Sequence, residues 1–508
     1  MPYITRQYES AKSFAAQSNQ LGNIVDSHDA ARLSAYNLYE DFYYNRPQSF
    51  RITKRADTDV EIYLPSAKKI VNASARFLAV DFDFTTKGGE ASVIDNLMRN
   101  IWKREELKRR QIKAKKSMLM RGDVVWHVTA DSSKPAGKRL TINTIHPSSY
   151  FPIESPDDAM RVIGCHLVDL VKDPREKTRT DKLVARRQTY RKEPNGQISS
   201  EAALFELGAW DDRNLEPSDI KRVAVLRPKT LLAQSITTIP VYHIANDEPD
   251  GSNWGTSQIA GIEYLINALN QSMTYEDLTL VLQGLGVYVS TAGPPLRSDG
   301  KPGTYPLHPG NVIEISPDDN FQRVSGVSSV APFQEHIKLL DTWALQGAGV
   351  PEMATGIVDV SVAQSGIALS LKMGPIIAEN ADKELAIQGK WEQLGFDLIN
   401  GWFPAFEGIN SPETEFSVTF GDAMPIDRKA RVDEIVGLYQ ADLILIDEAR
   451  AELEDLGYPY SKALTDKLIE QQQRKSQAAM GDPYAGELGS GATDLMDEIS
   501  NPDLRVVK

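Results

Sequence analysis

The chain has 508 residues, of which 41% are hydrophobic and 25% charged, and its formal net charge is -14. These proportions are typical of globular proteins, so they exclude a wholly disordered, collagen-like or mucin-like chain and allow several domains. The acidic total argues against tight binding of nucleic-acid phosphates, although weak and non-specific contacts remain compatible with it.

The apolar runs are short and interrupted by polar residues, which predicts no transmembrane helix, and the N-terminus shows no apolar secretory signal. Residues 1–120 have a mostly helical pattern, with helices expected at Ser66–Val80 and at about Ala91–Leu119. The second helix carries the main basic run. We interpret this run as a solvated helix face or a subunit contact rather than a nucleic-acid contact, because no aromatic residues interleave to stack on bases.

Between Gly122 and about Tyr190 the pattern changes, since GDVVWHVTA, RLTINTIHP and VIGCHLVDLV are rich in Val, Ile and Thr. Such residues, bounded by Asp, Ser, Pro and Gly, are typical of strands. The predicted fold class is therefore α+β, mainly helical.

The region from Trp254 to Trp402 contains three long helical patterns. The first covers about Gly255–Leu282, with apolar residues spaced 3, 4, 3 and 4 apart along one face. A Gly- and Pro-rich stretch with two short Val/Ile/Tyr runs follows and predicts a small strand-and-turn module. The second helix is expected at Val330–Leu345 and the third at Gly366–Trp402. Pro375 predicts a kink in the third helix, because proline removes an amide donor and clashes with the preceding turn.

Towards the C-terminus, ETEFSVTFGD alternates like a strand, and helices are expected at Arg428–Gln440 and Glu448–Leu456. Residues 431–508 hold 16 acidic and 8 basic residues, so much of the negative charge lies here. The last residues are rich in Gly, Ala, Ser and Asp, and we expect a largely disordered or mobile tail.

Familiar catalytic patterns are missing from the sequence. There is no G-x-x-x-x-G-K-[ST] loop, no G-x-S-x-G elbow and no H-E-x-x-H motif, and the seven histidines are scattered. The paired aspartates lie in turn-like contexts, which favours solvated turns over a Mg²⁺ site. Cys165 is expected to be a buried hydrophobic side chain, and it cannot meet His166 because strand neighbours point to opposite faces. We therefore predict no catalytic residue, metal or cofactor, and no enzyme.

The order of predicted parts is an α/β region, a long helix, a Gly/Pro-rich β module, a second helix, a loop and a Pro-kinked helix. Together with IYLPSAKKIVNASARFLAV, SSYFPIESPDD and GVPEMATGIVDVSVAQSGIALSLKMGPIIAENADKE, this order resembles the portal proteins of tailed bacteriophages, particularly those of actinobacterial siphophages. The most specific part is the GVP turn, the Asp-bearing loop and the S-G-x-A-L helix start. The resemblance spans roughly residues 35–460.

The resemblance implies the portal fold, a ring with wing, stem, clip, tunnel-loop and crown regions. The implied regions are: wing, 1–250; first stem helix, 251–284; clip, 285–328; second stem helix, 329–350; tunnel loop, 351–366; kinked wing helix and strand, 367–426; crown, 427–460; and the tail, 461–508.

Three groups of site residues follow from this assignment. The resemblance implies that a loop faces a DNA channel with a polar wall free of strong phosphate anchors; its residues are Asp359, Val360, Ser361, Val362, Ala363, Gln364 and Ser365. The alternative is a packed loop whose Ser365 caps the next helix. Arg297 and Lys301 of the clip would meet a motor or adaptor, DNA or an acidic partner, or else are exposed turn charges. Pro375 is the expected helix kink.

The function implied by the resemblance is a homo-oligomeric ring, a dodecamer, at the portal vertex of the capsid, assembled in the host cytoplasm. Double-stranded DNA would pass through it non-specifically during packaging and ejection. Its implied partners are the major capsid protein, the large terminase subunit and head-completion or adaptor proteins, and no membrane. The alternatives are a nucleic-acid-processing enzyme of the packaging machinery, for which no active-site motif is visible, and another virion adaptor.

Overall fold

The computed structural model describes residues 30–53, 60–172, 183–206, 222–285, 287–291, 293, 299–303, 317–324, 330–356, 366–423, 428–441 and 443–456. The chain divides into two compact units, Met1–Met424 and Pro425–Lys508. The fold is a mixture of helices and antiparallel sheets, so the predicted α+β class is confirmed.

The first unit begins with helices of the body, α3 (Ala30–Tyr43), α4 (Ser66–Phe77), α5 (Ala91–Arg104) and α6 (Leu107–Arg121). The single helix predicted over Ala91–Leu119 is wrong. It is two helices, because Glu106 adopts a left-handed conformation with φ 50°. A non-glycine residue in this region interrupts the helical ladder, so α5 and α6 can pack in different directions.

Three antiparallel sheets complete the body. One has the strand order β3-β2-β9, from Leu140–Ile145, Asp123–Ala130 and Val241–Ala245.

The second sheet has the order β4-β5-β6-β7-β8, from Tyr150–Ser155, Asp158–Lys172, Leu183–Lys192, Ile198–Glu206 and Arg222–Leu231. The third pairs β1 (Asp83–Lys87) with β12 (Glu415–Thr419), so segments more than 300 residues apart meet with Phe84 opposite Val418.

The main hydrophobic core joins the helices of the body to the three-stranded sheet. Its centre is a group of stacked and edge-packed aromatic rings, in which Trp391 contacts Phe82, Trp102 and Trp126. The ring centroids of Trp126 and Trp391 lie 4.8 Å apart. Large buried rings of this kind contribute strongly to stability, so the core holds α9, which carries Trp391, firmly against the body.

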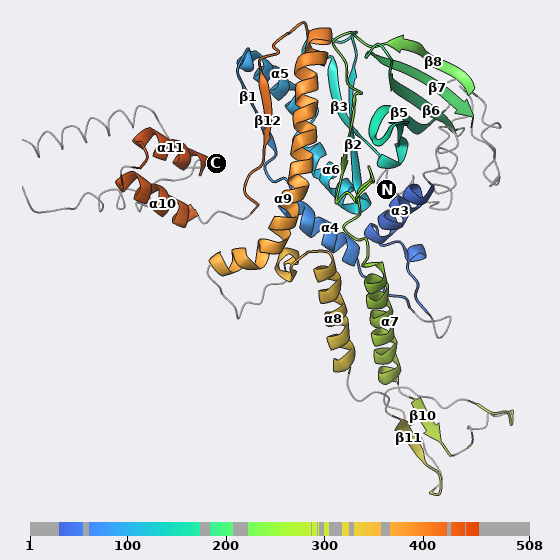
Figure 1. The fold of residues 1–508 in the computed structure, drawn as a ribbon. Helices are drawn as coiled ribbons and strands as arrows, with labels where there is room; N and C mark the ends of the chain where they lie inside the picture. The colour runs from blue at the N-terminus through green and yellow to red at the C-terminus, as the bar shows by residue number, and fades with distance from the viewer. Residues whose placement is uncertain are drawn as a thin grey trace, which may run out of the picture. The chain divides into compact units, whose positions relative to one another are not determined.

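A pair of antiparallel helices leaves this body, α7 (Glu263–Leu285) and α8 (Ala331–Gly347) (Figure 1). Between them, β10 (Val287–Ser290) pairs antiparallel with β11 (Phe321–Val324). The helix–module–helix order matches the prediction, although α7 begins later than expected, because Gly261 has φ +87° and residues 255–262 are not helical. The second predicted Val/Ile run, residues 311–316, lies outside the described residues.

Helix α9 (Gly366–Asp397) is continuous with a π-helical stretch, η5 (Leu398–Glu407). Its ribbon changes direction near its start and then runs straight along the body (Figure 1). Pro375 lies within the first third of this helix.

The second unit contains α10 (Arg428–Gln440) and α11 (Ile446–Asp455), which pack against each other. Both helices were expected from the sequence. The predicted tail, 461–508, lies outside the described residues. Within the described ranges, none of the helices has the length and apolar character needed to cross a bilayer.

Candidate functional site

The predicted channel residues, Asp359 to Ser365, lie outside the described residues, as does Arg297. Lys301 is described and exposed, and its backbone N–H donates to Asp299 Oδ1 at 3.1 Å, as in a tight polar turn. Pro375 lies inside α9. The described residues show the framework that carries these segments, namely the base of the α7–α8 pair and its attachment to the body.

One side of α7 is held by an extended segment that follows α3. Amide side chains on α7 accept hydrogen bonds from backbone N–H groups of this segment: Asn270 Oδ1 from Leu64 at 2.9 Å and Gln271 Oε1 from Thr53 at 2.7 Å. Gln271 Nε2 also donates to the carbonyl oxygen of Thr53 at 3.2 Å. The side-chain amide of Gln271 therefore bonds to both the N–H and the carbonyl oxygen of Thr53, as the backbone of a neighbouring strand would.

On the other helix of the pair, α8 is joined to the body by an ion pair. Lys69 Nζ on α4 lies 2.8 and 2.7 Å from the two carboxylate oxygens of Asp341. Both side chains are partly buried, so this contact is less screened than one on an open surface.

A buried polar cluster, which we call the clasp, ties together the segment before α7, the end of α8 and α9. Gln258 Nε2 donates to the carbonyl oxygen of Ala348 at 2.6 Å and to Glu379 Oε1 at 2.8 Å. Lys383 Nζ donates to Gln258 Oε1 and to Glu379 Oε1. Gly349, in the turn after α8, has φ +67°, a left-handed conformation that favours glycine.

The chain passes closely over itself just before the clasp. Gly122 ends α6 with φ +95°, and a Cβ on it would lie 2.4 Å from the carbonyl oxygen of Gly255. The two glycines allow backbone hydrogen bonds across the crossing, from Asn246 N to Gly122 O at 2.7 Å and from Gln258 N to Leu119 O at 2.8 Å. The crossing therefore fixes where the polypeptide leaves the body for α7.

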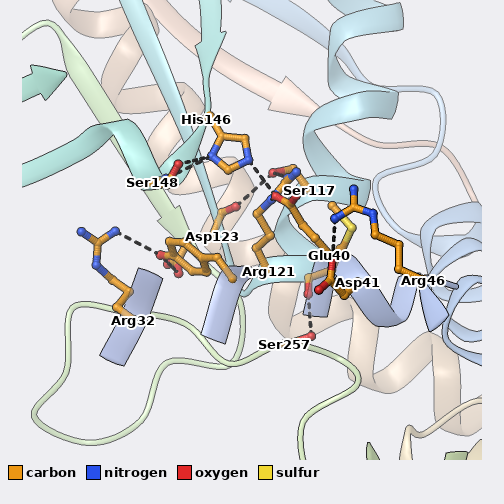
Figure 2. Close-up of polar contacts among 12 residues, drawn as sticks. Arg32, Glu40, Asp41, Arg46, Ser117, Arg121, Asp123, His146, Ser148 and Ser257 are labelled. Carbon is orange, nitrogen blue, oxygen red and sulfur yellow. Dashed lines mark hydrogen bonds and ion pairs between the residues drawn. The ribbon is translucent and has the colours of Figure 1, made fainter. Parts of the chain in front are cut away.

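Asp123 is the centre of a second polar cluster at this crossing (Figure 2). It is fully buried and accepts three hydrogen bonds: from Tyr36 Oη at 2.6 Å, His243 Nε2 at 2.7 Å and Gly255 N at 3.0 Å. These donors come from α3, β9 and the segment before α7. Burial and the Asp123 charge raise the pKa of Tyr36 well above its usual value, which keeps its hydroxyl a donor.

Next to it, Glu40 on α3 accepts from Arg121 Nε of α6 and from His146 Nε2 at 2.8 Å (Figure 2). Burial acts to raise the pKa of Glu40, but Arg121 and His146 reverse this and hold the pKa well below its usual value. His146 Nδ1 accepts from Ser148 N at 3.2 Å, so Nε2 carries the proton given to Glu40. These contacts position α3 on the body and do not resemble an exposed reactive site.

The basic run on α5 and α6 is divided between two roles. Arg104 donates to the carbonyl oxygen of Gly137, Arg110 to Asn143, and Lys115 to the carbonyl oxygen of Leu78, so these side chains connect the helices to the rest of the body. Others are exposed, namely Lys103, Lys108, Arg109 and Lys113. The interpretation as a solvated face fits the second group, whereas the first group is structural.

The helix pair exposes several large apolar side chains. Tyr264 is 83% exposed on α7, and Trp343 is 48% exposed on α8. Leu280, Val281 and Leu339 on the same two helices are also exposed. A cluster of such side chains on a projecting element indicates a surface that contacts another protein.

Among the described residues, no group of three or more His, Cys, Asp or Glu is arranged to hold a metal ion. Burial raises the pKa of the Cys165 thiol, and His166 on the same strand is directed to Thr189 at 2.8 Å. No local sequence pattern indicates the roles of Asp123, Gln258 and Lys383, since each has partners far along the chain.

Three solved structures illustrate what the chain resembles in three dimensions. A chain from the neck of a native gene transfer agent particle, computed with C12 symmetry, is 13% identical with a TM-score of 0.43 over 78% of this chain and 91% of its own. A chain from the virion of the native particle is 11% identical with a TM-score of 0.43, covering 84% and 94%. A chain from the neck of the empty particle, computed with C6 symmetry, is 12% identical with the same TM-score, covering 78% and 91%. At this distance the likeness carries no functional conclusion to this chain. No family model matches the sequence, and no curated protein matches it.

Proposed function

We propose that this chain is a bacteriophage portal protein, a subunit of a closed ring through which double-stranded DNA enters and leaves the capsid. The observation that carries this proposal is the α7–α8 pair, which brackets the β10–β11 module, is anchored at its base by the clasp and the crossing, and exposes apolar side chains along its length. An element with these properties is suited to packing against copies of itself around an axis.

Under this proposal, the regions of portal proteins would correspond to the elements of this chain. Helices α7 and α8 would form the stem, the β10–β11 module with Arg297 and Lys301 the clip, and residues 359–365 the channel loop. The helices α10 and α11 would belong to the crown. In this arrangement the clip would dock the large terminase subunit during packaging and a head-completion protein afterwards, and the body would meet the capsid protein.

The protein would act as a conduit without catalytic activity of its own. Among the described residues, buried titratable groups such as Asp123 and Lys383 hydrogen-bond to structural partners. The chain's net charge of -14 fits a wall that repels phosphates and lets DNA slide.

The proposal is tested by electron microscopy of the purified full-length protein. We expect ring particles with an axial hole, in a reconstruction that brings residues 359–365 to the hole. Particles without a hole, or a reconstruction with these residues far from the axis, would contradict the conduit. ATPase and nuclease assays on the same sample are expected to give no activity. Hydrolysis of ATP or DNA that remains after contaminating enzymes have been removed would favour the enzyme alternative.

A further inference from the structure

Strand β9 is the open edge of the three-stranded sheet. It pairs with β2 on one side and is the last strand in the order β3-β2-β9. At its two ends, Pro240 O accepts from Val128 N and Asn246 N donates to Gly122 O, so the even-numbered residues bond to β2. Because hydrogen bonding alternates along an antiparallel strand, the backbone groups of His243 and Ala245 point away from β2. In the described ranges no backbone partner meets them there.

A groove runs along this open edge. Its volume is about 760 Å³, and all five residues of β9 line it. One wall is α9, through Leu385, Ala386 and Gly389, and the other is β4 and β5, through Pro152, Met160 and Val162. Leu385 is 67% exposed and Met160 47% exposed, so each wall presents apolar surface to solvent, beside polar and charged lining residues such as Lys192, Lys390 and Gln393.

An unpaired strand between two walls that each carry apolar side chains has the features of a site for strand addition. The backbone of an added strand would bond to His243 and Ala245, and its alternate side chains would reach the two walls. Natural proteins cover such edges, because an open edge pairs with other chains and causes aggregation. The occupant expected at the β9 edge is therefore a short extended segment with β-forming side chains on both of its faces.

The chain itself offers such a segment beside the groove. Arg32, in the first turn of α3, stacks its guanidinium 3.8 Å from the ring centre of Trp254 and donates to the carbonyl oxygen of Tyr150 at 3.1 Å. Trp254 and Tyr150 both line the groove. The described chain begins at Ala30, two residues before Arg32, and therefore begins close to residues that line the groove.

The longest stretch before α3 that is rich in β-forming residues is Tyr3-Ile4-Thr5-Arg6-Gln7-Tyr8; the other is the shorter pair Ile24-Val25. The 21 residues between this stretch and Ala30 can extend about 70 Å, at roughly 3.3–3.6 Å per residue, so they reach any part of the groove. Attachment to the same chain also gives the segment a high effective concentration there.

We propose that residues Tyr3–Tyr8 add to β9 of the same chain as a fourth strand of the β3-β2-β9 sheet, filling the groove between α9 and β4–β5. The inference goes beyond the portal function and does not depend on ring formation. Its consequence is that the N-terminal segment covers the β9 edge of this sheet.

The test is hydrogen exchange, measured by mass spectrometry on the full-length protein with a peptide that covers β9. In the double variant Ile4→Pro/Thr5→Pro, one of two adjacent residues must lose an N–H directed at β9, whichever register the segment takes. We expect the amides of His243 and Ala245 to exchange about tenfold faster in this variant than in the natural protein. The matched control, Gln17→Pro/Ser18→Pro, lies in the linking residues and should leave the exchange unchanged.

Two results would overturn the inference. The first is equal exchange of β9 in the natural protein and in the Ile4→Pro/Thr5→Pro variant, which means that another segment or nothing occupies the edge. The second is recovery of protection in an isotope-labelled variant on mixing with unlabelled natural protein, because the strand then comes from a second copy. Neither result bears on the microscopy that tests the ring, so the two proposals fail separately.

Discussion

Trp391 and Trp343 lie in two helices of the same unit, yet their surroundings differ. Trp391 on α9 is 1% exposed and contacts three other aromatic rings, whereas nearly half of Trp343 on α8 is in contact with solvent. Other large apolar side chains of the helix pair are exposed like Trp343, namely Tyr264, Leu280, Val281 and Leu339. The base of the pair joins the body through Ile266 and Leu345 of the main core and through polar contacts such as the clasp and Lys69–Asp341. Under the proposed function, the exposed part of the pair would contact other copies of the chain.

The largest expected effect comes from the two tryptophans. Trp391→Ala should lower the free energy of unfolding by about 3–5 kcal/mol, because it leaves a cavity at the centre of the aromatic core. Trp343→Ala should lower it by less than about 1 kcal/mol, since the side chain is half exposed. Both values are measured by urea denaturation under conditions where the protein is monomeric.

The Trp343→Ala variant is also expected to change self-association. Mass photometry should show that Trp343→Ala weakens self-association although it leaves the monomer stable. A large loss of monomer stability in Trp343→Ala, or assembly as strong as that of the natural protein, would show that the exposed face of α8 has been misinterpreted.

A polar residue of the body gives the second effect. Asp123→Ala removes the acceptor of three buried donors, from Tyr36, His243 and Gly255, and should cost about 3 kcal/mol or more. The exposed Asp157→Ala is the control and should change stability by less than about 0.5 kcal/mol. Thermal unfolding of the two variants side by side measures the difference, and equal values would mean that the Asp123 cluster contributes little.

The smallest effect is expected where the helix pair meets the body. Lys69→Met removes the partly buried ion pair with Asp341, and we expect a loss of about 0.5–1 kcal/mol. The double variant Lys69→Met/Asp341→Leu should recover much of this loss, because no charge is then left unpaired. A loss of stability as large as that of Asp123→Ala would show that the Lys69–Asp341 ion pair contributes as much to the free energy of unfolding as the buried Asp123 cluster.

The local pattern predicted the helices α4, α7, α8, α9, α10 and α11 and the strands β2, β3, β5 and β12, because periodicities of 3.6 and 2 are properties of neighbouring residues. The local pattern predicted wrong helix boundaries where the backbone conformation of a single residue ends or delays a helix. Glu106 divides the predicted helix over Ala91–Leu119, and Gly261 delays the start of α7. Such left-handed residues leave little trace in hydrophobic spacing.

The sequence by itself therefore determined the order of parts in this protein, a strand-rich body, a helix–module–helix excursion and a proline-containing long helix. Only the tertiary structure decided which polar residues hold those parts together. Gln258 and Lys383 are 125 residues apart, and Tyr36 and Asp123 are 87 apart, so the contacts that define them come from chain segments whose meeting no local pattern records. It also decided that β9 is left with an open edge, because strand order within a sheet is fixed by packing between distant segments and not by the strand's own residues.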